Sequence, residues 1–139
     1  MLKNFSIDEL GIGMKASSTH LVTEEKVKLF SEISGDYNPV HLDEVYAKST
    51  RFEKRIAHGM LVSSFISSLF AMQLPGPGCI YISQSLLFKK PVFINDMVTA
   101  EVEITAIDTV KNRVMFETRC YVDKVIVLQG NAEIFIPKV

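Results

Sequence analysis

The stretch MLVSSFISSLFAMQLPGPG, residues 60–78, decides the fold expected of this chain. Its first fifteen residues contain no charged side chain, and the Pro-Gly-Pro-Gly sequence then ends the run. Fifteen residues are too few for a bilayer crossing, which takes roughly 20 apolar residues, and four of them are serines. We therefore expect a helix that is apolar on all sides because the rest of the protein surrounds it.

Beyond residue 78 the apolar pattern changes from a helical period to alternation. In TAEVEITA, residues 99–106, polar and apolar side chains alternate, which is typical of a strand with one face in water. Similar runs cover residues 80–88, 113–122 and 125–136, with turn signals at PVFIND, DTVKN and VDK. Four consecutive strands after one buried helix predict an α+β architecture, in which an antiparallel meander wraps around the helix.

Length, charge and cysteine content limit the kinds of protein that this chain can be. The 139 residues, 47% of them hydrophobic, suit one domain over residues 1–139 with a substantial core. The 15 basic and 16 acidic residues nearly cancel, so neither nucleic acid nor an anionic membrane is an expected partner. Cys79 and Cys120 have no CxxC spacing, and free thiols are expected rather than a disulfide or a zinc site. Free thiols and the lack of a signal-peptide pattern favour a cytoplasmic location.

Upstream of the long helix, the residues 23–35, TEEKVKLFSEISG, predict another helix, which Thr23 can cap and Gly35 can end. Its apolar side chains recur at helical spacing: Val27, Phe30 and Ile33. Pro39 disfavours helical geometry at Asn38, so DYNPVH, residues 36–41, is expected to be a loop. A short helix over residues 43–48 is expected to follow, and the long helix to begin near residue 58 or 59.

The segment SGDYNPVHLDEVYAKSTRFEKRIAHGMLVSSFIS, residues 34–67, contains two motifs in order. The matching residues are Asp36, Asn38, Pro39 and His41 in a D-x-N-P-x-H pattern, and His58 and Gly59 where the long helix should begin. This segment resembles the hydratase signature of the MaoC-like, (R)-specific enoyl-CoA hydratase family. The likeness continues through LPGPGCIYISQSLLFKKPVFINDMVTAEVEI and so covers most of the chain beyond the first twenty residues. It implies the hot-dog fold, an antiparallel sheet around a long central helix, and a homodimer or higher homo-oligomer.

The resemblance also implies a reaction: reversible addition of water to a trans-2-enoyl-CoA, giving an (R)-3-hydroxyacyl-CoA, with no metal and no organic cofactor. Such an addition needs a group that holds and deprotonates water, a proton for Cα, and a donor that stabilises enolate-like charge. Asp36 and His41 could supply the first two, and the backbone N–H of Gly59 the third. Which of Asp36 and His41 is the base stays open, because coupled groups share their titration. Taken singly, Asp36 could be a turn former, and His41 or His58 a structural brace.

Other residues carry weaker expectations. The resemblance places Ser67 near the catalytic pair, and Phe70, one turn further on, is expected to close the acyl tunnel and favour short acyl chains. Ser63, Ser64 and Ser68 are expected to hydrogen bond to the preceding turn. Six basic residues could meet the phosphates of coenzyme A or form a solvated surface: Lys48, Arg51, Lys54, Arg55, Lys89 and Lys90.

Three alternative functions fit the same pattern. A 3-hydroxyacyl-[acyl carrier protein] dehydratase would use the same chemistry on another carrier. A hot-dog thioesterase would direct water at the carbonyl carbon. A non-catalytic acyl-CoA-binding module would bind the thioester without hydrating it.

Overall fold

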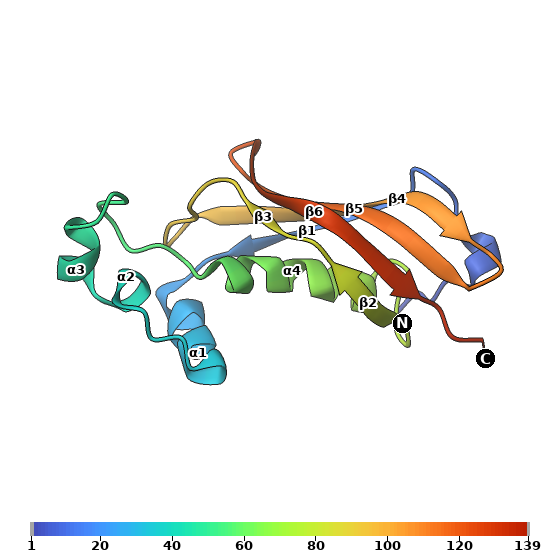
Figure 1. Ribbon diagram of the computed structural model, residues 1–139, viewed down its shortest axis with the longest axis horizontal. Coiled ribbons are helices and arrows are strands. Elements are labelled where there is room, and N and C mark those ends of the chain that lie inside the picture. Colours follow the sequence, from blue (N-terminus) through green and yellow to red (C-terminus); the bar gives the residue numbers. More distant parts are fainter. Residues whose placement is uncertain (1, 139) are drawn as a thin grey trace.

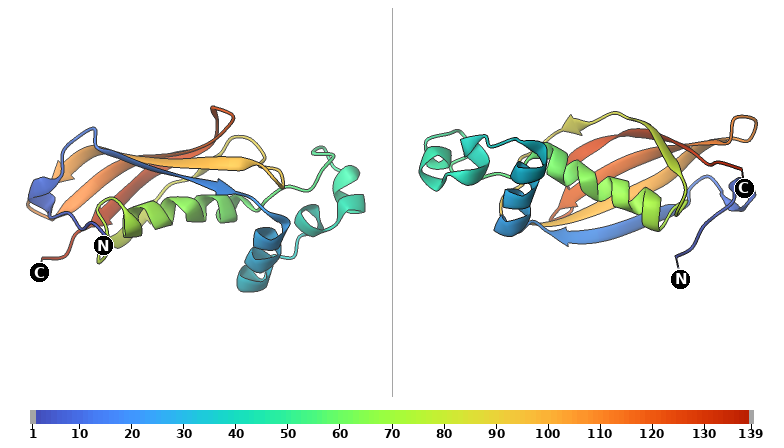
Figure 2. Two further views of the ribbon diagram at one scale, coloured as in Figure 1. Left: turned by 180° about the vertical axis from the view of Figure 1, so that it is seen from behind. Right: turned by 90° about the horizontal axis from the view of Figure 1, so that it is seen from below.

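The computed structural model describes residues 2–138. Its helices are the 3-10 helix η1 (Ile7–Glu9) and the α-helices α1 (Glu24–Ser34), α2 (Pro39–Leu42), α3 (Glu44–Lys48) and α4 (Gly59–Met72). Its strands are β1 (Lys15–Leu21), β2 (Ile80–Gln84), β3 (Leu87–Phe88), β4 (Met97–Asp108), β5 (Arg113–Val122) and β6 (Val125–Phe135). Helix α4 lies along one face of the sheet, and α1, α2 and α3 project beyond the sheet next to the start of α4 (Figures 1 and 2).

Within the described residues, six strands form one antiparallel sheet in the order β1-β4-β5-β6-β2, with the short β3 also on β6. The predicted α+β class is confirmed, but the predicted meander is correct only for β4, β5 and β6. Strand β2 pairs with β6 at the far side of the sheet, and not with the next long strand, β4. Strand β1, which the sequence patterns did not predict, pairs with β4 instead.

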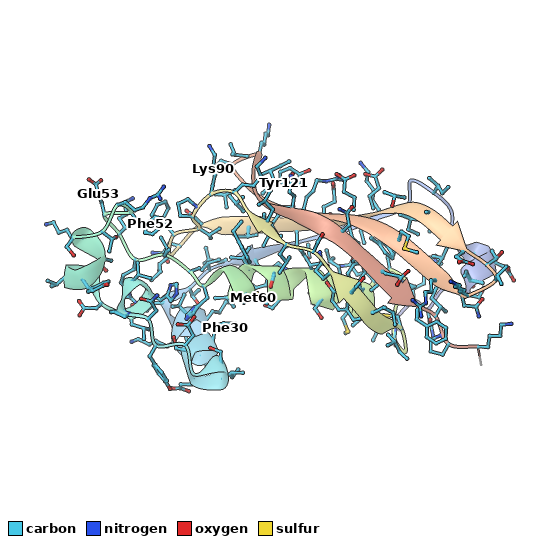
Figure 3. The ribbon with its side chains drawn as sticks, in the orientation of Figure 1. Phe30, Phe52, Glu53, Met60, Lys90 and Tyr121 are labelled. Atoms are coloured by element: carbon cyan, nitrogen blue, oxygen red, sulfur yellow. The ribbon has the colours of Figure 1, made fainter. Side chains whose placement is uncertain are left out.

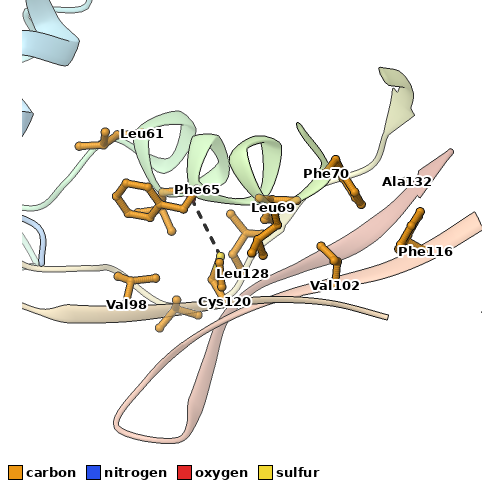
Figure 4. Packing of buried hydrophobic residues seen from close by; sticks show 14 of the residues in the cluster. Leu61, Phe65, Leu69, Phe70, Val98, Val102, Phe116, Cys120, Leu128 and Ala132 are labelled. Carbon is orange, nitrogen blue, oxygen red and sulfur yellow. Dashed lines mark hydrogen bonds between the residues drawn. The ribbon is translucent and has the colours of Figure 1, made fainter. Parts of the chain in front are cut away.

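The core lies between α4 and the sheet. Phe65, Leu69 and Phe70 of α4 face the alternating buried residues of the strands, among them Phe116, and Leu61 joins the same buried cluster at the start of α4 (Figure 4). The even-numbered positions 98, 100, 102 and 104 of β4 are buried, as the alternation predicts. The expectation that protein surrounds α4 is wrong for this single chain, because its other face is open: Met60 is 56% and Met72 48% exposed.

Local sequence signals explain how the elements before the site begin and end. The Thr23 hydroxyl accepts the N–H of Lys26, and Gly35 ends α1 with a φ of 79°, a left-handed conformation that glycine adopts without strain. The predicted loop at residues 36–41 is wrong in its second half, where Pro39 begins α2. Asn38 stays outside the helical region, as a residue before proline should, and its side chain caps the helix. Proline is tolerated there because a backbone N–H in the first turn of a helix has no acceptor within the helix, so its absence in proline costs no hydrogen bond.

Two further expectations can be compared with the structure. Both cysteines are free, as predicted, with Cys120 buried and Cys79 partly so. None of the helices described for residues 2–138 has the length and apolarity that a membrane crossing requires.

Candidate active site

His41 lies on α2 and is only 7% exposed. Its Nδ1 lies 2.7 Å from the carbonyl oxygen of Ile56. Because a carbonyl can only accept, Nδ1 carries the proton, and in the neutral ring Nε2 keeps its lone pair free. The backbone carbonyl of His41 accepts a hydrogen bond from Nε of Arg55 at 2.8 Å. The segment at residues 55 and 56 therefore fixes both the ring orientation and the backbone of His41.

Asp36 lies in the short loop between α1 and α2 and is exposed. Its N–H donates to the Ser34 hydroxyl, and its Oδ1 accepts the N–H of Asn38. The side chain of Asn38 accepts the N–H of Val40, so Asn38 braces the loop. The carbonyl oxygen of Asp36 lies 3.1 Å from Nε2 of His58.

These segments bring three ionisable side chains together. One ligand-type atom each from Asp36, His41 and His58 lies within 4.8 Å of the other two. The two imidazole rings are 3.9 Å apart between centroids and tilted by 31°. Two imidazoles and a carboxylate at this spacing could grip one water molecule or coordinate one divalent cation. Burial lowers the pKa of His58 below its usual value, which favours the neutral ring.

Gly59 begins α4, directly after His58. Its backbone N–H makes no hydrogen bond within residues 2–138 and lies at the positive end of the helix dipole. A Cβ on Gly59 would meet the Phe88 ring at 2.6 Å. The missing side chain of Gly59 therefore leaves room for the Phe88 ring.

A cavity of about 560 Å³ joins these residues, a size within the range of small-molecule sites. Asp36, His41, His58 and Gly59 all line it. Its apolar lining includes Phe30, Phe52, Met60 and Phe88, and its basic lining consists of Arg51, Lys89 and Lys90. Figure 3 labels Phe30, Phe52, Met60 and Lys90 at the end of the molecule where α4 begins. The cavity is therefore apolar with a few polar groups at one end and cationic side chains in its wall.

Ser67 and Phe70 do not line this cavity. Ser67 is exposed, and within the described residues its side chain makes no hydrogen bond to Asp36 or His41. Phe70 is 1% exposed and packs edge-on against Phe116. The structure thus brings Asp36, His41 and Gly59 together without Ser67 or Phe70, whose roles stay predictions. The other helix serines do bond to the preceding turn, as expected: Ser63, Ser64 and Ser68.

The six basic residues divide into distinct groups. Arg55 is not a solvated side chain: it is 8% exposed, and its Nη1 pairs with Glu24 at 2.8 Å. Arg51, Lys89 and Lys90 line the cavity, whereas Lys48 and Lys54 do not. Sequence reasoning missed the part that Arg55 plays in holding His41, because no local pattern distinguishes a buried arginine within a basic run.

Comparison with known proteins places this geometry in a family. Residues 8–126 match the model of the MaoC like domain. The chain is 44% identical over 130 residues to the (R)-specific enoyl-CoA hydratase of Rhodospirillum rubrum, covering 94% of this chain and 90% of that protein. It is 42% identical over 133 residues to the (R)-specific enoyl-CoA hydratase of Aeromonas caviae, covering 95% and 99%.

Among solved structures, the unliganded R-hydratase of Pseudomonas aeruginosa superimposes with a TM-score of 0.93 at 43% identity, covering 99% of this chain and 89% of that one. The family match covers every residue that lines the cavity except Val127 and Leu128. The expected fold is confirmed, and the chain belongs to the MaoC-like family of hot-dog proteins.

Proposed function

We propose that this protein is an (R)-specific enoyl-CoA hydratase, which reversibly adds water to a trans-2-enoyl-CoA to give an (R)-3-hydroxyacyl-CoA. The observation that carries the proposal is the meeting of Asp36 and His41 in one cavity with the unbonded N–H of Gly59. The similarity to two proteins named (R)-specific enoyl-CoA hydratase supports it.

In the proposed reaction, the carboxylate of Asp36 and Nε2 of His41 hold one water molecule by accepting its two hydrogens. The water oxygen bonds to C3 of the enoyl group while one of these side chains takes a proton. The C2–C3 π electrons move toward the thioester, whose oxygen gains negative charge opposite the N–H of Gly59. A proton returns to C2, so the sum is one water added across the double bond. No metal or organic cofactor takes part in this scheme.

The central test is hydration of crotonyl-CoA, followed by loss of its ultraviolet absorbance, with chiral analysis of the product. Asp36→Asn and His41→Gln should each lower kcat by roughly 10² to 10⁴, the usual contribution of positioned acid–base groups. Circular dichroism should show the same fold in both variants. Near-normal turnover in both variants would contradict the mechanism, and an (S)-product would contradict the stereochemical assignment. Release of free thiol would instead indicate a thioesterase, and binding without hydration a non-catalytic module.

We also propose coenzyme A, rather than acyl carrier protein, as the carrier. Coenzyme A brings a diphosphate and a 3′-phosphate to the site, and three basic side chains line the cavity: Arg51, Lys89 and Lys90. The phosphopantetheine of a carrier protein has one phosphate. The test compares kcat/KM for crotonyl-CoA with that for crotonyl thioester on a carrier protein, and a preference for the carrier protein would favour the dehydratase alternative.

Short acyl chains are part of the proposal, as the sequence suggested. Turnover of four-carbon and eight-carbon enoyl-CoAs should differ in favour of the shorter, and equal turnover would count against this preference.

A homodimer is proposed from the sheet edge at β2. Ile80, Tyr81 and Ile82 are 39–47% exposed there, which is unusual for three successive large apolar residues. An exposed apolar edge strand is suited to pairing with a second copy. Light scattering after size-exclusion chromatography should give twice the chain mass, and a monomeric mass at micromolar concentration would argue against the dimer.

A further inference from the structure

His58 lies where the parts of the site meet. It is the residue before Gly59 at the start of α4 and is 2% exposed. Its Nε2 is 3.1 Å from the carbonyl oxygen of Asp36 and 3.1 Å from the hydroxyl of Ser31 on α1. Its ring packs against that of His41, with centroids 3.9 Å apart. One side chain thus contacts both members of the proposed catalytic pair.

The hydrogen bond to Asp36 fixes the tautomer of His58. Because a carbonyl oxygen can only accept, Nε2 must carry the proton and donate it. In the neutral ring the lone pair then belongs to Nδ1, which is buried and has no hydrogen-bond partner in the described part of the chain. His58 therefore acts in the structure as a hydrogen-bond donor through its Nε2–H.

Asp36 needs such a contact because its loop is otherwise held only locally. Its remaining hydrogen bonds, within residues 2–138, run to Ser34 and Asn38, each two positions away. Bonds of this range shape a turn, but they do not fix the turn relative to α2 or α4. The bond from His58 spans 22 positions and ties the Asp36 backbone to the helix that begins with Gly59.

We propose that His58 is a positioning residue of the proposed hydratase: its Nε2–H anchors the backbone of Asp36 so that the carboxylate and Nε2 of His41 face the same water molecule. The inference rests on the proposed function.

Two substitutions of His58 by residues with neutral amide side chains test the Nε2–H donor separately from the rest of the ring. In His58→Gln the side-chain amide nitrogen would lie near the position of Nε2, whereas in His58→Asn it would lie near that of Nδ1. The experiment therefore measures kcat and KM for crotonyl-CoA in wild type, His58→Gln and His58→Asn, with melting temperatures for all three. We expect His58→Asn to lower kcat at least tenfold with KM little changed, and His58→Gln to stay within a few-fold of wild type.

Ser31→Ala is the matched control, because it removes the other partner of Nε2 and leaves the bond to Asp36. Its kcat should stay near that of wild type. A kcat for His58→Asn equal to wild type would overturn the proposal, as would equal losses in the two His58 variants. A loss of kcat in Ser31→Ala as large as in His58→Asn would also overturn it, because the hydrogen bond between His58 and Ser31 of α1 would then be the one on which activity depends.

Wild-type protein provides a test that does not depend on whether a variant folds. In nitrogen-15 NMR of the imidazole side chains, His58 should be the neutral tautomer with the proton on Nε2, and a proton on Nδ1 would overturn the proposal. If wild type does not hydrate crotonyl-CoA, the proposed function fails. If wild type is active and His58→Asn is equally active, only the positioning role fails.

Discussion

Replacing Arg55 with methionine tests how far the site depends on a buried charge. Arg55 is 8% exposed, and its guanidinium makes two contacts of 2.8 Å, from Nε to the carbonyl of His41 and from Nη1 to Glu24. Methionine retains an apolar side chain of similar length but offers no donor. The substitution therefore removes both contacts while largely filling the same space.

The two contacts differ in their expected energies. Leaving the carbonyl of buried His41 without a donor costs about 1–3 kcal/mol. Part of this is offset, because Nη2 of Arg55 is itself buried without a partner in the described part of the chain and its desolvation is relieved. The carboxylate of Glu24 is half exposed, so water screens its ion pair with Arg55 and the pair adds little. We expect a net loss of about 2 kcal/mol, which for a chain of this length lowers the melting temperature by roughly 6–10 °C.

The assay combines thermal unfolding with crotonyl-CoA turnover for wild type, Arg55→Met and Glu24→Gln. Arg55→Met should lower both the melting temperature and kcat, because the backbone carbonyl of His41 loses the donor that helps to hold the residue in place. Glu24→Gln, which leaves the bond to His41 in place, should change both quantities much less. An unchanged melting temperature in Arg55→Met, or an equal destabilisation in Glu24→Gln, would refute the assignment of the energy to the His41 carbonyl.

Three further predictions follow from the same geometry. Burial lowers the pKa of His58 and of His20 below 6.5. The unfolded chain therefore binds more protons than the folded chain just below that pH. The free energy of unfolding should consequently fall as pH drops from about 7 to about 5. Urea titrations should show a shallower fall for His58→Gln, and a pH-independent free energy would contradict the lowered pKa values. Removal of divalent cations with a chelator should leave hydration unchanged, whereas activity lost and then restored by a metal would mean that Asp36, His41 and His58 bind a cation. Gly59→Ala should displace the Phe88 ring, which is half exposed and can move, and so should cost less than about 1 kcal/mol. A double-mutant cycle with Phe88→Ala should show that the two changes are coupled; additive effects would argue against the contact.

Much of the fold could be predicted because helix ends are set by local chemistry. Thr23 and Gly35 bound α1 in the structure as the sequence indicated, and α4 begins at the predicted glycine. Strand β1 was missed because an edge strand can form from residues with weak apolar alternation, once a neighbour such as β4 supplies the hydrogen bonds. The pairing of β2 with β6 was missed for a related reason: strand order depends on contacts between distant segments. Ile33 fits the helical period but is 83% exposed, because α1 leaves that side uncovered.

The site was predictable to the extent that its residues are close in sequence. Asp36 and His41 are five positions apart around a proline, so their proximity follows from local geometry. Ser67 was expected near the catalytic pair, but it follows Gly59 by eight residues, which turn a helix by about 80° beyond two full turns and advance it by roughly 12 Å. That rotation and advance account for the exposure of Ser67 away from the cavity. The bond from Arg55 to His41 spans 14 positions and had no signal in the sequence.

The short connection from Arg55 to Gly59 explains why two separate motifs belong to one site. Its first two residues hold the backbone and ring of His41, and its last two contact Asp36 and begin α4. Between them, the N–H of Ala57 donates to the carbonyl of Val92 at 2.7 Å, which fixes the connection to the segment leading into β4. Because one braced segment carries these contacts, the proposed acid–base pair and the N–H of Gly59 cannot shift independently. In the proposed mechanism, a displacement of this connection should therefore impair proton transfer and oxyanion stabilisation together, even where neither Asp36 nor His41 is altered.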